Sequence, residues 1–431
     1  NASRRATMTV VGQTQVVYIY DNANRLTQVQ QGTSTVTIAY DDADRRTSVT
    51  YPNTNKIEYA YNAASELTTV TYKQGATTLG TLTYTYDAAG NRIKTGGTFA
   101  RSNLPPALAT TNYNANNQQL TFGTTTETYD LNGNLATTTD AGVTTTYTWN
   151  ARNQLTGITK TGFTASFTYD SFGRRTGKTI NGTITNFLYD GLNPVQEKNG
   201  ATVTANLLTG LGIDEFFTRT DGVGVRALLP DALGSTVALG DGTGVLQTQY
   251  TYEPFGLTTQ TGAANTNSYK YTGREDDGSG MTYYRARYYQ PRFQRFIAED
   301  PIGFRGGVNF YNYVAGNPLR WTDPFGLVVE ICSRFLTPHT FICVDGNCSG
   351  KYPSGNPIVS PGEIRDNSED KSSASCSAVP GQQSNPACFE SCVEKRILKR
   401  GPSGDLYNYV GGNCGQWVVE VISECRLQCP K

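Results

Sequence analysis

A repeat of about 20 residues constrains this chain more than any other feature of its sequence. Segments such as YIYDNANRLT, IAYDDADRRT and FTYDSFGRRT recur, and each places an aromatic residue directly before an acidic or amide residue. Tyr20, Tyr40 and Tyr169 hold the equivalent position in these three segments. Units of this length bury an apolar face only against their neighbours, so the repeat predicts a stack of similar units.

Each unit is typical of a β-hairpin. In Phe167-Thr168-Tyr169 the aromatic side chains alternate with threonine, which predicts a strand with its aromatic residues on one face. Asp170 and Gly173 follow and predict a turn, because aspartate caps its own backbone and glycine accepts a positive φ. An aromatic ladder can bind sugars, but cross-strand aromatic pairs more commonly hold a sheet together. We therefore interpret the ladder as core, in a mainly β chain.

The cysteines divide the chain into two unlike parts. All nine lie between Cys332 and Cys429, and residues 1–327 contain none. Nine cysteines in the last 104 residues are typical of a small domain stapled by disulfides. The one histidine of the chain, His339, lies in the same segment. We predict a domain boundary near residue 327.

The charge and hydropathy of the chain exclude some partners. With 36 Lys+Arg against 36 Asp+Glu, the chain has no net charge to attract nucleic acid or an anionic membrane. No apolar run reaches the roughly 18 residues of a membrane span. The chain opens without methionine or an apolar signal segment, so we interpret Asn1 as an internal residue of a longer chain or the end of a trimmed one.

The repeat resembles the YD repeats of the Rhs and teneurin-like family, most clearly from Tyr169 to Thr176. Further on, TGREDDGSGMTYYRARYYQPRFQRFIAEDPIGF and NFYNYVAGNPLRWTDPFGL resemble the Rhs-associated core domain. The resemblance implies a YD-repeat β shell over residues 1–231 and an Rhs-associated core over 232–327. A small, disulfide-rich α+β domain would follow over 328–431, as a passenger enclosed by the shell.

Residues 318–327 fit the P-x4-D-P-x-G-L junction, after which relatives in this family cut their own backbone. The resemblance places the cut between Leu327 and Val328 and assigns Asp300 and Asp323 as the catalytic carboxyls. Hydrolysis without a metal or a serine or cysteine nucleophile needs an activated water and a proton donor, which two carboxyls sharing a proton supply. Asp-Pro steps also mark ordinary turns, but two of them beside a change of composition favour cleavage.

Three arginines precede these carboxyls in the sequence. Arg285, Arg287 and Arg295 are cations that we expect to orient the carboxylates or the strand that is cut. The sequence does not distinguish which of them does so. Glu299, directly before Asp300, stands where some relatives carry a basic residue.

The C-terminal segment lacks the composition of a nuclease. It carries 10 Lys+Arg and 11 Asp+Glu, whereas a nuclease is usually basic and uses several histidines. His339 is not followed by the zinc-deaminase pattern, and the segment has no C-x-x-C pair. We therefore expect no metal site, no cofactor and no nucleic-acid partner. Residues 360–386, rich in Ser, Pro, Asn and acidic residues, are expected to form a long loop.

Two cysteine pairs have helical spacing. Cys388 with Cys392, and Cys425 with Cys429, are each four residues apart and would share one face of a helix. Two such helices packed together are candidates for disulfide bonds, although the sequence leaves the pairing open. Nine is an odd number, so at least one thiol stays free when all others are paired.

Cys414 is our candidate for a reactive thiol. It follows Gly-Gly-Asn and precedes an amphipathic run, which predicts a position at a helix N-terminus, where the thiol pKa is lowered. His339, at the start of a predicted strand that turns at 345–346, is the imidazole available as its base. Cys414 is equally able to form half of a disulfide.

The stretch LYNYVGGNCGQWV, after a histidine-bearing strand, resembles the circularly permuted NlpC/P60 enzymes of the lecithin:retinol acyltransferase-like group. The resemblance implies a thiol hydrolase or acyltransferase, with Cys414 as nucleophile and His339 as base. Its substrate would be peptidoglycan peptide or lipid.

Together these features predict the C-terminal part of an Rhs-type polymorphic toxin. The resemblance implies secretion, delivery into a target cell by a secretion-system component, and a cognate immunity protein. We expect this toxin to act in the periplasm, where disulfides form and wall peptides are exposed. Two alternatives remain open. The tail is a non-enzymatic, disulfide-stapled module that binds a receptor or a membrane, or the chain is a teneurin-like adhesive YD-repeat protein without a toxin.

Overall fold

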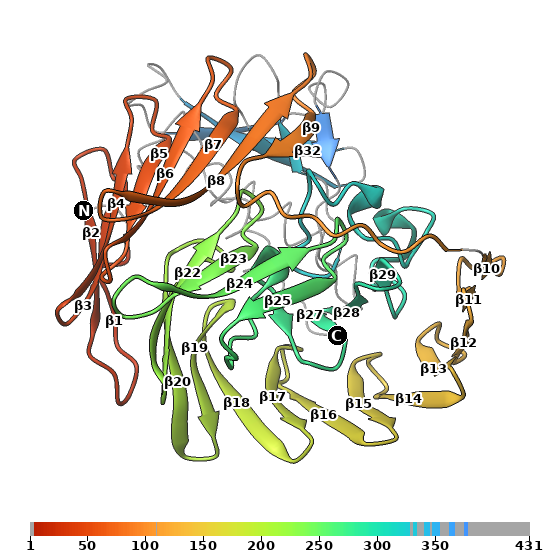
Figure 1. Ribbon diagram of the computed structural model, residues 1–431. Helices are drawn as coiled ribbons and strands as arrows, with labels where there is room; N and C mark the ends of the chain where they lie inside the picture. The colour runs from red at the N-terminus through yellow and green to blue at the C-terminus, as the bar shows by residue number, and fades with distance from the viewer. Residues whose placement is uncertain are drawn as a thin grey trace.

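Two large antiparallel sheets are built from the repeats in the order of the chain (Figure 1). The computed structural model describes residues 4–108 and 110–327, and beyond them the backbone of five short strands. In each large sheet the strand order follows the sequence, so every strand pairs with the strand before it and the strand after it. The segment between the two sheets crosses the molecule from β9 to β10 (Figure 1).

The nine-stranded sheet consists of β1 (Thr7–Met8), β2 (Val16–Tyr20), β3 (Leu26–Gln31), β4 (Ser34–Tyr40), β5 (Arg46–Thr50), β6 (Asn55–Tyr61), β7 (Leu67–Gln74), β8 (Thr77–Tyr86) and β9 (Arg92–Gly96). The sixteen-stranded sheet consists of β10 (Thr111–Tyr113), β11 (Gln119–Phe122), β12 (Thr125–Tyr129), β13 (Leu135–Asp140), β14 (Val143–Trp149), β15 (Leu155–Lys160), β16 (Phe163–Tyr169), β17 (Arg175–Ile180), β18 (Thr183–Asp190), β19 (Asn193–Asn199), β20 (Thr202–Thr209), β21 (Phe216–Asp221), β22 (Gly224–Pro230), β23 (Thr236–Gly240), β24 (Leu246–Tyr252) and β25 (Thr258–Gly262).

A small four-stranded sheet follows, with three short 3₁₀ helices around it. These elements are η1 (Tyr271–Gly273), β26 (Glu275–Asp276), β27 (Thr282–Tyr284), β28 (Arg287–Gln290), β29 (Arg295–Phe296), η2 (Gly303–Gly306) and η3 (Val314–Gly316). The five strands beyond residue 327 form a sheet of their own in the order β33-β32-β31-β30-β34. They are β30 (Ile331–Ser333), β31 (Thr340–Val344), β32 (Asn347–Pro353), β33 (Gly362–Asp366) and β34 (Ser375–Ser377).

The predicted turn chemistry is confirmed at the best-preserved repeat. One carboxylate oxygen of Asp170 accepts hydrogen bonds from the amides of Phe172 and Arg174, both at 2.9 Å, and Gly173 has a φ of +80°. The other oxygen accepts from the Arg174 guanidinium at 2.8 Å. Arg174 also donates to the carbonyl of Gly191 in the next turn, at 3.3 Å. The Asp–Arg pair therefore links adjacent turns as well as closing its own.

The repeated tyrosine explains the period of the sequence. Its ring packs in the sheet, and its hydroxyl donates to a backbone carbonyl of the preceding repeat: Tyr40 to Leu26 at 2.9 Å and Tyr169 to Leu155 at 2.6 Å. The same bond is made by Tyr20, Tyr61, Tyr86 and Tyr189, and by the indole N–H of Trp149. These aromatic residues are thus core and inter-repeat hydrogen-bond donors at once.

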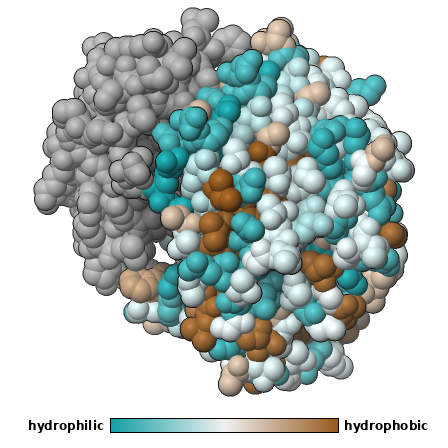
Figure 2. Space-filling view, turned by 90° about the vertical axis from the view of Figure 1, so that its left-hand side faces the viewer, coloured by the Kyte–Doolittle hydropathy of each residue, from teal (hydrophilic) through white to brown (hydrophobic). Residues whose placement is uncertain are grey.

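The two large sheets share one hydrophobic core. Apolar residues of the nine-stranded sheet, such as Val29 and Ile57, form a single buried cluster with Leu229 and Ala238 of the sixteen-stranded sheet. Polar bonds join the sheets as well, since the Tyr51 hydroxyl donates to the carbonyl of residue 228 and the amide of Asn55 to that of residue 244. On the face shown in Figure 2, apolar side chains form separate patches among hydrophilic ones.

The small sheet packs against the sixteen-stranded sheet through apolar and ionic contacts. Tyr283 and Tyr288 belong to one buried cluster with residues of β13 to β16. Arg175 of β17 is fully buried, and its guanidinium lies 2.5 Å from Asp277 and 2.6 Å from Glu275. Burial raises the pKa of Glu275, but Arg175 and Lys178 outweigh it and lower that pKa to about 2. These buried ion pairs therefore join the sixteen-stranded sheet to the small sheet.

Outside the repeats, three predictions concern residue 231, the strand after His339 and residues 360–386. The boundary predicted at residue 231 falls between β22 and β23, which pair with each other, so the sixteen-stranded sheet runs across it to Gly262. The strand predicted after His339 is present as β31, followed by β32, while His339 itself lies outside the described residues. The loop expected over 360–386 is wrong in part, because β33 and β34 lie within it and pair through main-chain bonds that need no particular side chains.

No helix in the described ranges has the length and hydropathy of a membrane span. The candidate disulfide cysteines Cys388, Cys392, Cys425 and Cys429, and the candidate nucleophile Cys414, lie outside the described residues.

Candidate active site at the core junction

The side chain of Asp323 shapes the end of the core segment. One carboxylate oxygen accepts hydrogen bonds from three backbone amides, those of Phe325 at 3.2 Å, Gly326 at 2.8 Å and Leu327 at 3.1 Å. Pro324 has no N–H, and its fixed φ starts the turn that brings the following amides back to the carboxylate. Asp323 is 2% exposed, so this turn is held in the interior, directly before residue 328.

The carbonyls of the same segment are held from the opposite side by the turn between β27 and β28. Arg285 donates through its guanidinium to the carbonyl of residue 324, the Ala286 amide donates to that of residue 325 at 3.0 Å, and the Nε of Arg287 donates to that of residue 326. Three consecutive residues therefore bind three consecutive carbonyls. We call residues 323–327, held in this way, the junction segment.

Close approach of the two backbones requires glycine at position 326. Gly326 has a φ of +69°, and a Cβ at this position would lie 2.1 Å from the carbonyl oxygen of Tyr284. The glycine before the predicted cut therefore allows the junction segment to lie against the β27–β28 turn.

Asp300 and Asp323, far apart in the sequence, meet at one guanidinium group. Nη2 of Arg287 lies 2.9 Å from Oδ2 of Asp300 and 3.8 Å from Oδ2 of Asp323. All three side chains are buried, and the Arg287 guanidinium stacks 3.7 Å from the ring centroid of Phe296. Asp300 is fixed at the start of its own turn, where it accepts from the amide of Ile302 at 3.1 Å. The two predicted carboxyls thus share one cation.

The two oxygens of Asp323 have unequal surroundings. Oδ1 accepts the three amides, whereas Oδ2 is buried and has no hydrogen-bond partner among the described residues. Burial raises the pKa of Asp323 to about 7, Asp300 adds to the rise, and Arg287 and the amides of the junction segment oppose it. Near neutral pH the carboxyl therefore holds a proton for a large part of the time, and Oδ2 is the oxygen free to carry it. A protonated carboxyl beside an arginine-paired carboxylate is an acid and a base in one site.

The other two predicted arginines have different partners. Arg285 binds the junction segment through the carbonyl of residue 324, and its remaining bonds go to the shell. Arg295 donates to the carbonyl of Asn117 at 2.6 Å and stacks on Tyr311 at 4.9 Å, which ties β29 to a shell turn. Glu299 approaches the Tyr311 hydroxyl at 3.4 Å and lies over Gly133 of the shell. Of the three arginines, Arg287 is the one that the structure places between the carboxyls.

Val328 lies outside the described residues, and so do Cys414 and His339. Within residues 4–108 and 110–327, no three His, Cys, Asp or Glu side chains are grouped so that they could hold a metal ion.

A family profile described as "Teneurin YD-shell" matches residues 49–302, more than half of the chain. The chain belongs to the teneurin YD-shell family. The match takes in strands of both large sheets and the whole small sheet, and it ends just after Asp300. The predicted YD-repeat shell is therefore confirmed, while the NlpC/P60 resemblance of the tail stays a prediction.

Curated relatives of this YD-shell chain are much longer proteins. Toxin subunit YenC1 of Yersinia entomophaga is 36% identical over 115 residues, which are 26% of this chain and 12% of the relative. Toxin subunit YenC2 of the same organism is 41% identical over 92 residues, 20% of this chain and 10% of the relative. Double-stranded DNA deaminase toxin A of Burkholderia cenocepacia is 52% identical over 52 residues, 12% of this chain and 4% of the relative. The chain thus matches about a tenth or less of the length of these proteins.

Solved structures share the YD-shell fold. The Tc holotoxin pore of Photorhabdus luminescens superposes with a TM-score of 0.56 at 20% identity and covers 74% of this chain and 20% of that one. The crystal structure of TcdB2-TccC3-TEV gives a TM-score of 0.53 at 20% identity, over 73% of this chain and 20% of that one. At this level of identity the similarity establishes the fold.

Proposed function

We propose that this chain is the shell and junction of an Rhs-type toxin, which cuts its own backbone between Leu327 and Val328. The observation that carries the proposal is Asp323: its carboxyl binds the amides that lead up to this bond, and its pKa lies at about 7. The relatives named as toxin subunits support the toxin assignment.

In the proposed reaction Asp300 acts as base and Asp323 as acid. The Asp300 carboxylate takes a proton from a water molecule, whose oxygen bonds to the carbonyl carbon of Leu327. The carbon–nitrogen bond to Val328 then breaks, and the leaving nitrogen takes the proton of Asp323. One water is consumed, and the products are a carboxyl group at Leu327 and an amine at Val328. The proton taken up by Asp300 then passes to Asp323, which restores the starting state of both carboxyls. Arg287 holds the two carboxyls together and its Nε binds the carbonyl of residue 326.

Intact mass and denaturing-gel mobility of the purified chain test this proposal. We expect the wild type to separate into residues 1–327 and 328–431, and Asp323→Asn and Asp300→Asn to stay whole. Asparagine at 323 keeps an oxygen for the three amides but cannot donate a carboxyl proton. Asp241→Asn, which alters a turn carboxylate between β23 and β24, is the matched control and should be cut like the wild type. An uncut wild type would refute self-cleavage and favour the adhesive alternative, whereas a cut Asp323→Asn chain would refute Asp323 as the acid of the reaction.

We also propose that residues 328–431 are the effector that cleavage separates from the shell. Relatives that share similarity with this chain are named as a DNA deaminase toxin and as tRNA nucleases, so the shared similarity does not specify one effector chemistry. For this chain the proposed chemistry remains that of a thiol hydrolase, with Cys414 and His339. Alkylation of the native chain followed by mass mapping tests it, because a Cys414 held in a disulfide cannot attack a substrate.

Assembly with a further toxin component, delivery into a target cell and neutralisation by an immunity protein belong to the same proposal. The Tc structures, whose titles name TcdB2 together with TccC3, support assembly with a partner component. Co-purification of the uncut chain with a candidate partner component tests the assembly directly.

A further inference from the structure

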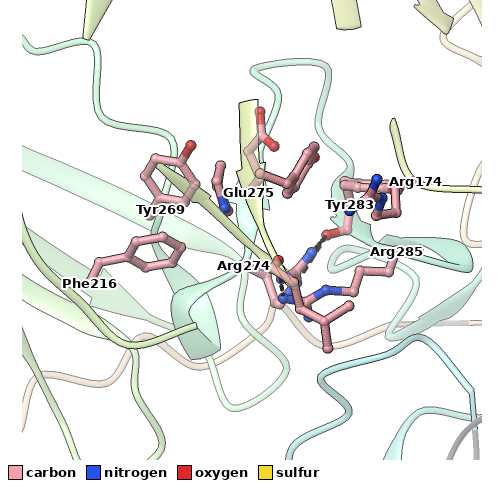
Figure 3. Close-up of a pocket in the computed structure, with 10 residues that line it drawn as sticks. Arg174, Phe216, Tyr269, Arg274, Glu275, Tyr283 and Arg285 are labelled. Carbon is pink, nitrogen blue, oxygen red and sulfur yellow. Dashed lines mark hydrogen bonds between the residues drawn. The ribbon is translucent and has the colours of Figure 1, made fainter. Parts of the chain in front are cut away.

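A second buried ionic group lies on the shell side of the junction segment. The carboxylate of Asp214 lies 2.5 Å from the guanidinium of Arg274, and 2.7 and 3.0 Å from two nitrogens of Arg285. Figure 3 shows Arg274 and Arg285 lying side by side. Asp214 comes from the connection between β20 and β21 of the shell, whereas the two arginines flank β26 and β27 of the small sheet. One shell carboxylate therefore pairs with two cations that flank strands of the small sheet.

Asp214 is held in place by the fold of the shell. It has a φ of +59°, in the left-handed region, and its amide donates to the side-chain oxygen of Asn193 at 2.8 Å. Arg285 is tied to the same two shell connections, because it also donates to the carbonyl of Leu192 at 3.0 Å. Both connections, 191–192 between β18 and β19 and 210–215 between β20 and β21, must reach the small sheet before Arg285 has its full set of partners.

Arg285 also contacts the junction segment, and so connects it to the shell. It is itself in the left-handed region, with a φ of +56°, and its guanidinium donates to the carbonyl of Pro324. Without Asp214, two buried guanidinium groups would face each other without their shared carboxylate, which is a costly arrangement. Arg274 would keep its bonds to the carbonyl of Tyr283, at 2.8 and 3.1 Å. Arg285 would lose two bonds to Asp214 and Arg274 only one, so we expect Arg285 to move and to release the carbonyl of residue 324.

We propose that Asp214 and Arg285 are a positioning pair that makes self-cleavage depend on the completed shell. The inference rests on the proposed function, and assigns the pair no part in proton transfer. Asp214, in the β20–β21 connection of the shell, binds Arg285, and Arg285 binds the carbonyl of Pro324. The bond after Leu327 is thereby held near the carboxyls of Asp300 and Asp323. A chain whose shell strands β18 to β21 are not in register would keep its passenger attached.

The test is the rate of self-cleavage of the full chain in Asp214→Asn and Arg285→Met. Arg285→Met is the gentler change, because it leaves Asp214 paired with Arg274. We expect each variant to be cut at least about tenfold more slowly than the wild type. The double variant should be no slower than Arg285→Met alone, because the two residues act as one unit. Asp140→Asn, which removes a half-exposed ion pair with Arg292, is the matched control and should be cut at the wild-type rate.

The pH dependence of the rate separates positioning from chemistry. Because the pair acts on the backbone of residue 324, the midpoint near pH 7 set by Asp323 should stay where it is in both variants. In the uncut Asp300→Asn background, adding Arg285→Met should speed hydrogen exchange at the amides of residues 325–327 by at least about tenfold, and leave β6 unchanged.

The possible outcomes keep the two proposals apart. An uncut wild type refutes the proposed function, and the exchange measurement then decides the positioning role alone. A wild type that is cut, with variants cut at its rate or with additive losses in the double variant, overturns the positioning pair and leaves self-cleavage standing. A shifted pH midpoint overturns it as well.

Discussion

The two large repeat sheets and the segment from residue 267 to 327, here called the core segment, are stabilised in opposite ways. In the repeats one small set of bonds recurs: a turn aspartate, the arginine that follows it, and a tyrosine that reaches the previous repeat. In the core segment the pairs Arg287–Asp300 and Arg274–Asp214 each occur once and are largely buried. The comparison teaches that redundancy builds the shell, whereas unique buried charges set the geometry of the junction.

The energetic contrast follows from exposure. The pair Arg45–Asp41 in a repeat turn has about a quarter of each side chain exposed, and such pairs contribute at most about 1 kcal/mol. The pair Arg175–Asp277 is fully buried, so removing one partner leaves the other charge in the interior. Four predictions sharpen or break this comparison, beginning with the largest effect.

Adjacent arginines provide the sharpest test, because Arg174 closes a repeat turn and Arg175 enters the core. Arg175→Met should lower the free energy of unfolding by about 3–5 kcal/mol, since Asp277 and Glu275 would keep only Lys178 as a cation. Arg174→Met should cost at most about 1 kcal/mol, because its side chain is 39% exposed. Urea denaturation measures both. Equal losses would contradict the distinction between the two regions.

The two regions should also differ in the sign of their pH dependence. The pKa of Asp323 is raised to about 7, so its contribution to stability is present below its unfolded pKa near 4 and is lost as the pH rises through 7. The pKa of Asp241, in a turn, is lowered to about 2, mainly by the hydroxyl of Thr243. Its contribution is present above its unfolded pKa and is lost as the pH falls through 2.

Unfolding free energies of the wild type, Asp323→Asn and Asp241→Asn between pH 2 and 8 check these signs. In Asp323→Asn the free energy of unfolding should no longer decline between about pH 4 and 7. In Asp241→Asn it should no longer decline below about pH 4. If the free energy of unfolding changed with pH in the same direction for both carboxylates, burial would not distinguish Asp323 from Asp241.

Glycine substitutions compare close packing with backbone strain alone. Gly326→Ala should cost about 2–3 kcal/mol, because it combines a positive φ with a Cβ placed 2.1 Å from a carbonyl oxygen. Gly316→Ala has a similar φ of +74° and nothing within 4 Å, so it should cost about 1 kcal/mol. Thermal melts of both variants give the difference, and a larger loss at Gly316 would reverse the argument.

The smallest effect concerns a single repeat. Tyr86→Phe removes the hydroxyl that donates to the carbonyl of Leu67 at 2.8 Å and should cost about 1 kcal/mol. Tyr18→Phe is the matched control, because the buried Tyr18 hydroxyl has no hydrogen-bond partner among the described residues, and its loss should be neutral or slightly stabilising. A loss at Tyr18→Phe as large as that at Tyr86→Phe would show that the inter-repeat hydrogen bond does not account for the loss at Tyr86.

The repeats were predictable because their chemistry is local. Asp170 and Gly173 specify their turn from four residues of sequence, and the alternation of aromatic residues and threonine specifies the faces of the strand. Asp300 and Asp323 were indicated by a junction motif, and the structure brings both to Arg287. Choosing Arg287 among three arginines required the fold, since it depends on which side of the β27–β28 turn faces the junction segment.

Asp214 could not be found from the sequence. Its neighbours LGIDEF carry no turn motif or carboxyl pair that marks it, and its role arises only because the β20–β21 connection reaches two arginines of another sheet. Sequence signals report contacts made within a repeat or a motif. Contacts between a repeat and the core depend on how the whole sheet curves, which no local pattern records.

The sequential strand order has a consequence for how the protein is made. Because each strand of the large sheets pairs with the strand synthesised just before it, the sheets can form while the ribosome is still adding residues. The residues that surround the junction segment leave the ribosome before it does; they are Asp214, Arg285, Arg287 and Asp300. The junction segment is therefore the last part of the site to be synthesised, after the residues that hold it.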